Sequence, residues 1–187
     1  MASRALVLSG GGPVGIAWET GIAAGLSEQG VQLGEADLFV GTSAGSVVGA
    51  QLAMSQVPQA MVASQFARQE RPAVAGVLSQ GRQAPDMRGL MEVMAKAADA
   101  DRPLEERLAE VGRYALGAQT IEEEAFVAGF GNRLAGAQGW TEKDFRCTAI
   151  DALSGQFVIW DRDSGVPLAR AIASSCAVPG VYPPITD

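Results

Sequence analysis

The feature that most constrains the fold is a pattern that occurs twice: a short apolar run, a glycine cluster, and then a helix-like segment. Residues 5–9 (ALVLS) lead into Gly10-Gly11-Gly12, and residues 37–40 (DLFV) lead into Gly41-Thr42-Ser43-Ala44-Gly45. A short apolar run ended by glycines is typical of a buried strand in a parallel sheet that is covered by helices. The pattern therefore predicts an α/β fold with a largely parallel central sheet.

Helix-like segments fill most of the remaining chain. Residues 16–29 are an expected helix ended by Gly30, and residues 44–55 are a second one that is rich in small residues. Residues 57–139 read as a helical elaboration of the same domain rather than a second domain. A length of 187 residues also suits one domain, so we expect residues 1–187 to form a single domain.

Local signals mark individual elements. Asp86 is an expected N-cap, and Thr120 with Glu123 has the spacing of a capping box at the start of a helix. Two apolar runs, residues 145–150 and 156–160, lie on either side of a short turn that contains glycine, and this arrangement predicts a β-hairpin.

The charge and residue counts exclude several classes of protein. With 14 basic and 21 acidic residues the net charge is −7, which argues against nucleic acid as a partner. There is no histidine, so a Ser-His-Asp or Cys-His mechanism and a histidine-ligated metal are impossible within this chain. The cysteines, Cys147 and Cys176, form no metal or disulfide motif and are expected to be reduced thiols. We expect no cofactor, no metal, no membrane span and a cytoplasmic location.

The second glycine cluster carries the strongest chemical signal. It has the pattern G-x-S-x-G at the point where a strand ends and a helix begins, which is the context of a nucleophile elbow. The sharp turn exposes the Ser43 hydroxyl, and Gly41 and Gly45 allow neighbouring backbones to approach closely. The N-terminus of the following helix favours negative charge at the same place. Ser43 is therefore the expected nucleophile, with Thr42 completing the elbow.

The first glycine cluster has two interpretations. Gly10, Gly12 and Gly15 match G-x-G-x-x-G, a dinucleotide fingerprint, and Glu35 and Asp37 lie where a ribose-binding acid is expected. The alternative is an oxyanion hole in which the amides of Gly10, Gly11 and Gly12, together with the amide of Ala44, face the developing alkoxide. The second interpretation is favoured because it explains both clusters at one edge of the sheet.

With these residues in view, the chain resembles the patatin-like phospholipase family. The resemblance spans nearly the whole chain in four blocks, which are residues 5–12 with Gly15, residues 40–45, residues 148–151 with Gly155, and residues 174–180 with Pro183-Pro184. It implies a three-layer α/β/α fold and a serine acyl hydrolase with a Ser-Asp dyad, in which an aspartate takes the place of histidine. The implied substrate is a lipid or another acyl ester, with transient contact to a membrane surface.

The chain departs from the family pattern at its end. The resemblance implies a catalytic aspartate in an Asp-Gly-Gly or Asp-Gly-Ala motif beyond the Pro-Pro block, but no aspartate here precedes glycine, and Asp187 stands three residues after Pro184. We therefore expect a piece of the domain, incomplete at its C-terminus, that lacks its general base and is inactive or weakly active. An exposed sheet edge or apolar face would then favour self-association. Asp151 is expected to be structural.

A different class of function stays open. The same pocket could serve a non-catalytic module that binds acyl chains or lipids. Met87, Leu90, Met91 and Met94 fall on one face of an expected helix, and this face is either ordinary core or an adaptable wall for an acyl chain.

Overall fold

The structure is a computed structural model that describes residues 3–70, 85–134 and 139–186. In chain order its elements are β1 (Ala5–Leu8), α1 (Gly12–Glu28), the short 3₁₀ helix η1 (Leu33–Glu35), β2 (Leu38–Gly41), α2 (Ala44–Ala53), α3 (Pro58–Glu70), α5 (Met87–Ala97), α6 (Leu104–Gly117), α7 (Glu123–Arg133), β3 (Asp144–Ile150), β4 (Phe157–Trp160) and α8 (Leu168–Ser175).

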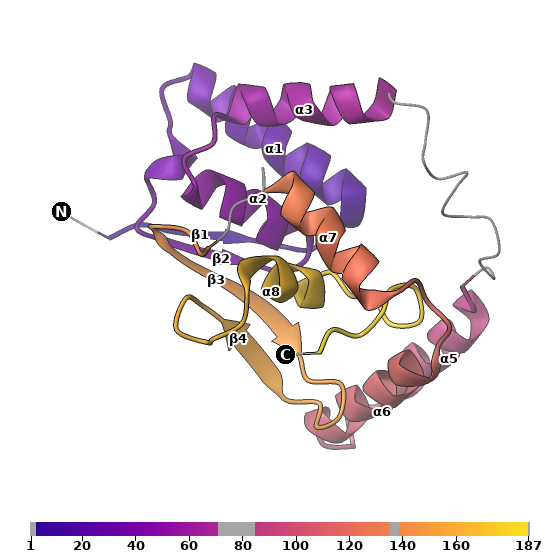
Figure 1. Ribbon diagram of the computed structural model, residues 1–187. Coiled ribbons are helices and arrows are strands. Elements are labelled where there is room, and N and C mark those ends of the chain that lie inside the picture. The colour runs from indigo at the N-terminus through magenta and orange to yellow at the C-terminus, as the bar shows by residue number, and fades with distance from the viewer. Residues whose placement is uncertain (1–2, 71–84, 135–138, 187) are drawn as a thin grey trace.

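The four described strands form one sheet in the order β1-β2-β3-β4 (Figure 1). β1, β2 and β3 are parallel, and β4 runs antiparallel to β3 as the predicted hairpin. The predictions of an α/β fold and of a largely parallel sheet are confirmed. In the parallel register Leu8 lies beside Gly41, so the glycine segments that follow β1 and β2 emerge at the same edge of the sheet.

The core lies between the sheet and helices α2 and α8. Every residue of α2 is buried, and α2 packs against β1, β2 and β3. α8 packs against β3, while α1 covers α2 and α3 covers α1 (Figure 1). Phe39, Val48, Cys147 and Ile172 have no exposed surface. Small residues in α2 permit this close contact, since Gly49 lies directly against the Phe145 ring.

The opposite face of the sheet carries exposed apolar side chains. Val7 of β1 is 72% exposed and Phe157 of β4 is 63% exposed. By the strand register Ile150 and Ile159 lie on this same face, and both are exposed. An exposed apolar face was predicted from the sequence. The self-association expected from it stays a prediction.

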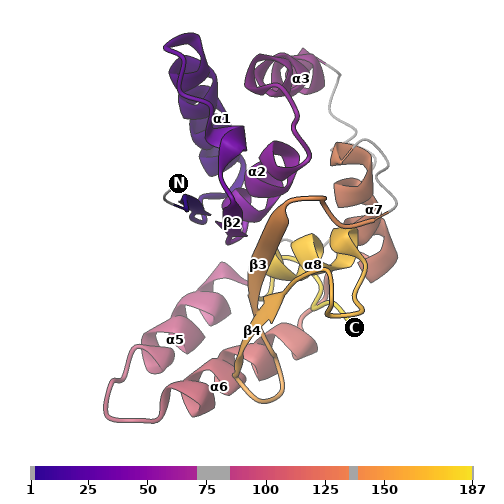
Figure 2. The ribbon, with the colours of Figure 1, turned by 90° about the vertical axis from the view of Figure 1, so that its left-hand side faces the viewer.

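Helices α5 and α6 form a pair at the opposite end of the molecule from α1 and α3 (Figure 2). α6 rests directly on the turn of the β3–β4 hairpin. Gly112 lies against the backbone of Ala152, and Gly155 lies against the backbone of Glu105. At both contacts a Cβ would collide with backbone, so glycine lets the helix pair approach the hairpin.

Several local predictions can be checked residue by residue. The Asp86 side chain accepts a hydrogen bond from the Gly89 amide at 2.9 Å, so the predicted N-cap of α5 is confirmed. The capping box is wrong. α7 has no side-chain cap, and Thr120 bonds instead to the Ile121 carbonyl. The reason is that α7 begins at Glu123 with Glu122 as its N-cap, so Thr120 does not occupy the cap position, and the Glu123 side chain pairs with Arg170 of α8.

Helix α1 also differs from its prediction, because it begins inside the glycine cluster rather than after it. Gly12 is its first residue, and Pro13 occupies the first turn, where the missing amide hydrogen is not needed. The predicted end is confirmed, since Gly30 follows the helix with φ of +81°. Within the three described ranges, no helix combines the length and apolar character needed to cross a bilayer.

Candidate active site

Ser43 occupies the junction between β2 and α2, in a strained backbone conformation. Its φ is +52° and its ψ is −111°, in a region that residues other than glycine rarely enter. The side chain is half-buried. Within the described part of the chain its hydroxyl makes no hydrogen bond, so it is available to react with a bound molecule.

The two glycines of the elbow (residues 41–45) are required by packing. A Cβ on Gly41 would lie 2.5 Å from the Ser46 Cα, and a Cβ on Gly45 would lie 2.6 Å from the Leu8 Cβ. A Cβ on Gly45 would also overlap the Leu8 carbonyl group, which belongs to rigid backbone. The elbow therefore folds only because neither position carries a side chain.

The glycine loop (residues 10–12) lies directly beside Ser43. A Cβ on Gly10 would lie 3.6 Å from the Ser43 Cβ. The strand end before the loop is tied to the elbow by two backbone bonds. The Leu8 carbonyl accepts from the Thr42 amide at 3.0 Å, and the Ser9 carbonyl accepts from the Gly45 amide at 2.9 Å. The loop is thus held in a fixed position relative to the serine.

The N-termini of two helices meet at this place. α1 begins at Gly12 and α2 begins at Ala44, and a Cβ on Gly15 in the first turn of α1 would lie 3.0 Å from the Ala44 Cβ. The first amides of a helix have no partner within it, and the helix dipole places partial positive charge there. Two such ends beside Ser43 favour a negative charge at the serine.

The four predicted oxyanion donors have unused amides. In the part of the chain that the structure describes, the amides of Gly10, Gly11, Gly12 and Ala44 donate no hydrogen bond, whereas the neighbouring Gly45 amide is already bonded. Gly10 and Gly11 are exposed and Gly12 is half-buried, so a ligand can reach them. The geometry is compatible with an oxyanion hole.

Three further side chains hold the backbone of Ser43, and sequence reasoning missed the role of all three. The Ser175 Oγ accepts a hydrogen bond from the Ser43 amide at 2.8 Å. The Ser46 Oγ donates to the Ser43 carbonyl at 2.6 Å, and the Cys176 Sγ donates to the same carbonyl at 3.4 Å. Ser175 lies in the block 174–180 that resembles the family, but the sequence does not show its contact with Ser43, because 132 positions separate the two residues.

Glu19 was also missed, although the sequence held a signal. It is an acid three residues after Ile16, an apolar residue of the expected helix 16–29 that packs against the core. Glu19 is only 7% exposed, and in the described residues its Oε2 has no hydrogen-bond partner. Burial raises the pKa of the Glu19 carboxyl, and the nearby Ser9 amide partly opposes this effect. A buried carboxyl thus lies near Ser9, which precedes the glycine loop.

No carboxylate of the described residues bonds to the Ser43 hydroxyl. Asp151 caps the hairpin turn, accepting from the Leu153 amide and from the amide and hydroxyl of Ser154. These bonds lower the pKa of Asp151 and agree with the structural role expected for it. Asp187 lies outside the described residues.

The acids needed for dinucleotide binding are engaged with Arg4. The Asp37 carboxylate accepts from the Arg4 backbone amide at 2.8 Å, and the Glu35 carboxylate lies 3.6 Å from the Arg4 guanidinium. Gly15, the third glycine of that motif, packs against Ala44. This arrangement gives no support to the dinucleotide interpretation.

A cavity of about 420 Å³ lies elsewhere, between the start of α5 and the C-terminal half of α6. Asp86, Arg113, Tyr114 and Gly180 are among its lining residues, and none of the predicted site residues lines it. The cavity is therefore separate from the surroundings of Ser43.

The methionine face of α5 is not ordinary core. Met87, Met91 and Met94 are all at least half exposed, and Val93 is the buried residue of this helix. The core interpretation is wrong for these three side chains. A role in binding an acyl chain stays a prediction.

Comparison with one solved structure supports the fold. The structure of the ExoU–SpcU complex from the type III secretion system of Pseudomonas aeruginosa is similar with a TM-score of 0.50 and 24% identity, over 96% of this chain and 37% of that one. Full-length ExoU in complex with full-length SpcU, from the same organism, gives 0.48 and 21% identity over 95% and 38%. The chain thus spans less than half the length of these matched chains. The search of curated proteins gives no match.

The family comparison covers almost the entire sequence. A protein-family model described as "Patatin-like phospholipase" matches residues 6–186, which include both glycine segments, the hairpin and α8. The chain therefore belongs to the patatin-like phospholipase family.

Proposed function

We propose that the protein is a serine acyl hydrolase that cleaves ester bonds in lipids, with Ser43 as its nucleophile. The observation that carries the proposal is the half-buried, strained serine beside four unused backbone amides. Membership of the patatin-like phospholipase family supports the same class of reaction.

In the proposed reaction the Ser43 Oγ attacks the carbonyl carbon of the ester, and its proton passes to a general base. Negative charge develops on the carbonyl oxygen, where the amides of Gly10, Gly11, Gly12 and Ala44 stabilise it. The ester C–O bond then breaks, and the alcohol leaves with the proton from the base. Water hydrolyses the acyl-enzyme by the same route, releasing the fatty acid and restoring Ser43.

The general base in this proposal is an aspartate beyond residue 187 in the full protein. Residues 1–187 alone would then retain the nucleophile and the oxyanion donors but turn over ester about 10²–10⁴-fold more slowly than the full protein. Rapid ester hydrolysis by residues 1–187 would contradict this part of the proposal and would make Asp187 the candidate general base.

The nucleophile is tested by labelling with a fluorophosphonate probe, followed by mass spectrometry of the labelled peptide. We expect the label on Ser43 in the full protein, and no label in S43A. S27A is the matched control, because among the described residues the Ser27 hydroxyl hydrogen-bonds to Gln32 alone, near the far end of α1. Undiminished labelling of S43A would exclude Ser43 as the nucleophile.

The alternative is a module that binds acyl chains without hydrolysing them. The exposed Met87, Met91 and Met94 supply an adaptable apolar surface for it, and they could equally receive a substrate chain or touch a membrane surface briefly. Tight binding of a fatty acid by the full protein, with no release of product from an ester, favours this alternative. We also propose a cytoplasmic location and a single domain for residues 1–187, and each of these needs a test of its own.

A further inference from the structure

The backbone amide of Ser43 has one partner in the described structure, and that partner lies far away in the sequence. The Ser175 hydroxyl oxygen accepts from this amide at 2.8 Å. Ser175 is the last residue of α8, and it reaches the elbow because α8 packs along β3, next to the strand that precedes Ser43.

The backbone amide and the backbone carbonyl of Ser43 are held differently. Its carbonyl accepts from the amides of Ser46 and Val47 at 3.0 and 3.3 Å, as at the start of any helix, and also from the Ser46 hydroxyl. Its amide is accepted by no residue of α2 in the described structure, because the Ser46 hydroxyl, the side chain at the position that could accept from it, donates to the Ser43 carbonyl instead. Without the Ser175 oxygen, a half-buried N–H in a strained conformation would lack a protein partner.

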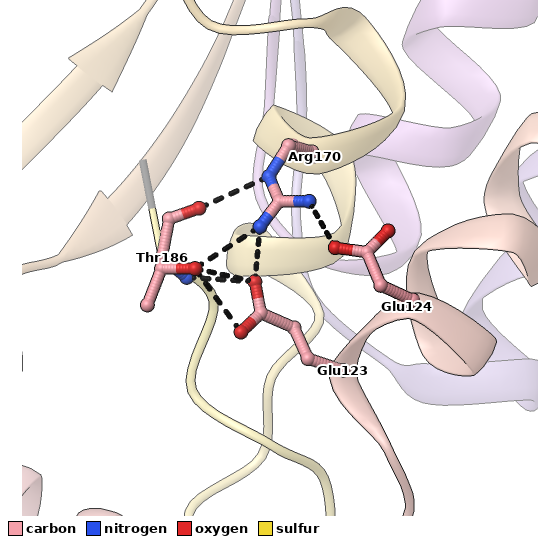
Figure 3. A network of polar contacts seen from close by, with 4 residues as sticks. All are labelled: Glu123, Glu124, Arg170 and Thr186. Atoms are coloured by element: carbon pink, nitrogen blue, oxygen red, sulfur yellow. Dashed lines mark hydrogen bonds and ion pairs between the residues drawn. The ribbon is translucent and has the colours of Figure 1, made fainter.

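Ser175 is itself held in place, because α8 is anchored to its neighbours. Near the start of α8, Arg170 forms ion pairs with Glu123 and Glu124 of α7, and its guanidinium also donates to the carbonyl and hydroxyl of Thr186 (Figure 3). The helix that presents Ser175 is thus tied to α7 and to the chain that follows it.

We propose that Ser175 is a positioning residue for the nucleophile: its hydroxyl oxygen holds the Ser43 amide, and thereby fixes the peptide plane that aims the Ser43 hydroxyl. This inference rests on the proposed function, since it assigns a role in acylation. It places part of the active-site support on α8, outside both glycine segments. It also gives the ion pairs of Arg170 with Glu123 and Glu124 an indirect role in positioning Ser43, because they orient the helix that carries Ser175.

The test compares S175A with S174A in the full protein. The two serines are neighbours at the end of α8, but the Ser174 hydroxyl bonds to Trp160 and to the Ala171 carbonyl rather than to the elbow. We expect S175A to lower the rate of fluorophosphonate labelling and kcat by about 10- to 100-fold, with KM changed less than about twofold. S174A should retain the wild-type rate of labelling, and S175T should restore most of the rate because it keeps the oxygen.

A second measurement keeps the test independent of turnover. Hydrogen exchange of the Ser43 amide, followed by NMR, should be slow in the wild type, S174A and S175T, and fast in S175A. Unchanged exchange in S175A would show that the bond is not formed. Faster exchange with unchanged labelling would show that the bond does not position the nucleophile. Either result overturns the inference. A failure of the proposed function is seen separately, as full labelling of S43A.

Discussion

Gly10 differs from the other glycines of the active site in why glycine is needed there. In the elbow, a side chain at Gly41 or Gly45 would collide with backbone atoms of the neighbouring turn or strand. In the glycine loop, a Cβ on Gly11 would lie 2.7 Å from the Gly15 Cα, and Gly12 has a φ of +57°. A side chain at Gly10 would make only ordinary contacts, the nearest at 3.6 Å from the Ser43 Cβ, and Gly10 has no positive φ.

This difference separates structural from functional glycines. The elbow glycines are accounted for by packing, so they carry no information about chemistry. Gly10 is not accounted for by packing or by backbone conformation. A reason for glycine there is the space above the Ser43 hydroxyl, where a substrate carbonyl would lie in the proposed reaction.

The largest effect is expected for G45A. The added Cβ would overlap the Leu8 carbonyl group, and neither β1 nor α2 can move without disturbing the buried core. We expect a loss of at least about 3 kcal/mol in the free energy of unfolding, measured by chemical denaturation. The control is G21A, a helical position in α1 with no atom within 4 Å of the added Cβ. A G45A variant as stable as G21A would refute the packing argument.

A smaller effect, on activity alone, is expected for G10A. Its free energy of unfolding should stay within about 1 kcal/mol of the wild type, because the new contacts are ordinary. Its kcat for ester hydrolysis should fall by about 10²-fold, since a methyl group beside Ser43 displaces the carbonyl from its productive position. Wild-type turnover by G10A would mean that the space above Ser43 is not used by the substrate.

The smallest effect concerns Glu19, the buried acid near the Ser9 amide. Burial raises the pKa of its carboxyl above the ordinary value of 4.5. A raised pKa in the folded state contributes stability below pH 4.5, and this contribution is lost as the pH rises through the folded pKa. The E19Q variant cannot titrate there, so it should gain stability relative to the wild type between pH 4 and pH 8.

Thermal unfolding of E19Q and wild type across this pH range checks the prediction. The variant E28Q removes an exposed carboxylate from the same helix and controls for the change in net charge. A stability difference between E19Q and wild type that does not change with pH would show that Glu19 is solvated in the native protein.

The strands and the elbow could be predicted because their signals are local. Apolar runs ended by glycine fixed the positions of β1 and β2, and the G-x-S-x-G spacing located Ser43 at the strand–helix junction. The start of α1 was missed because its first residue is a glycine, which is normally a poor helix former. The capping box failed for another reason, since α7 begins later than the spacing predicts, with Glu122 rather than Thr120 at its N-cap.

The supporting residues of the site could not be predicted by the same means. Ser175 meets Ser43 only after α8 has packed on the sheet, and nothing in either segment specifies the other. The exposure of Met91 is likewise a tertiary outcome, because periodicity shows that residues share a face but not whether another element covers it.

The uncovered face of the sheet has a practical consequence for assays with lipids. Detergent used to disperse a water-insoluble substrate will also coat exposed side chains such as Val7, Phe157 and Ile159. A rate measured in micelles therefore combines chemistry at Ser43 with adsorption of the protein to the amphiphile, and a short water-soluble ester reports the chemistry alone.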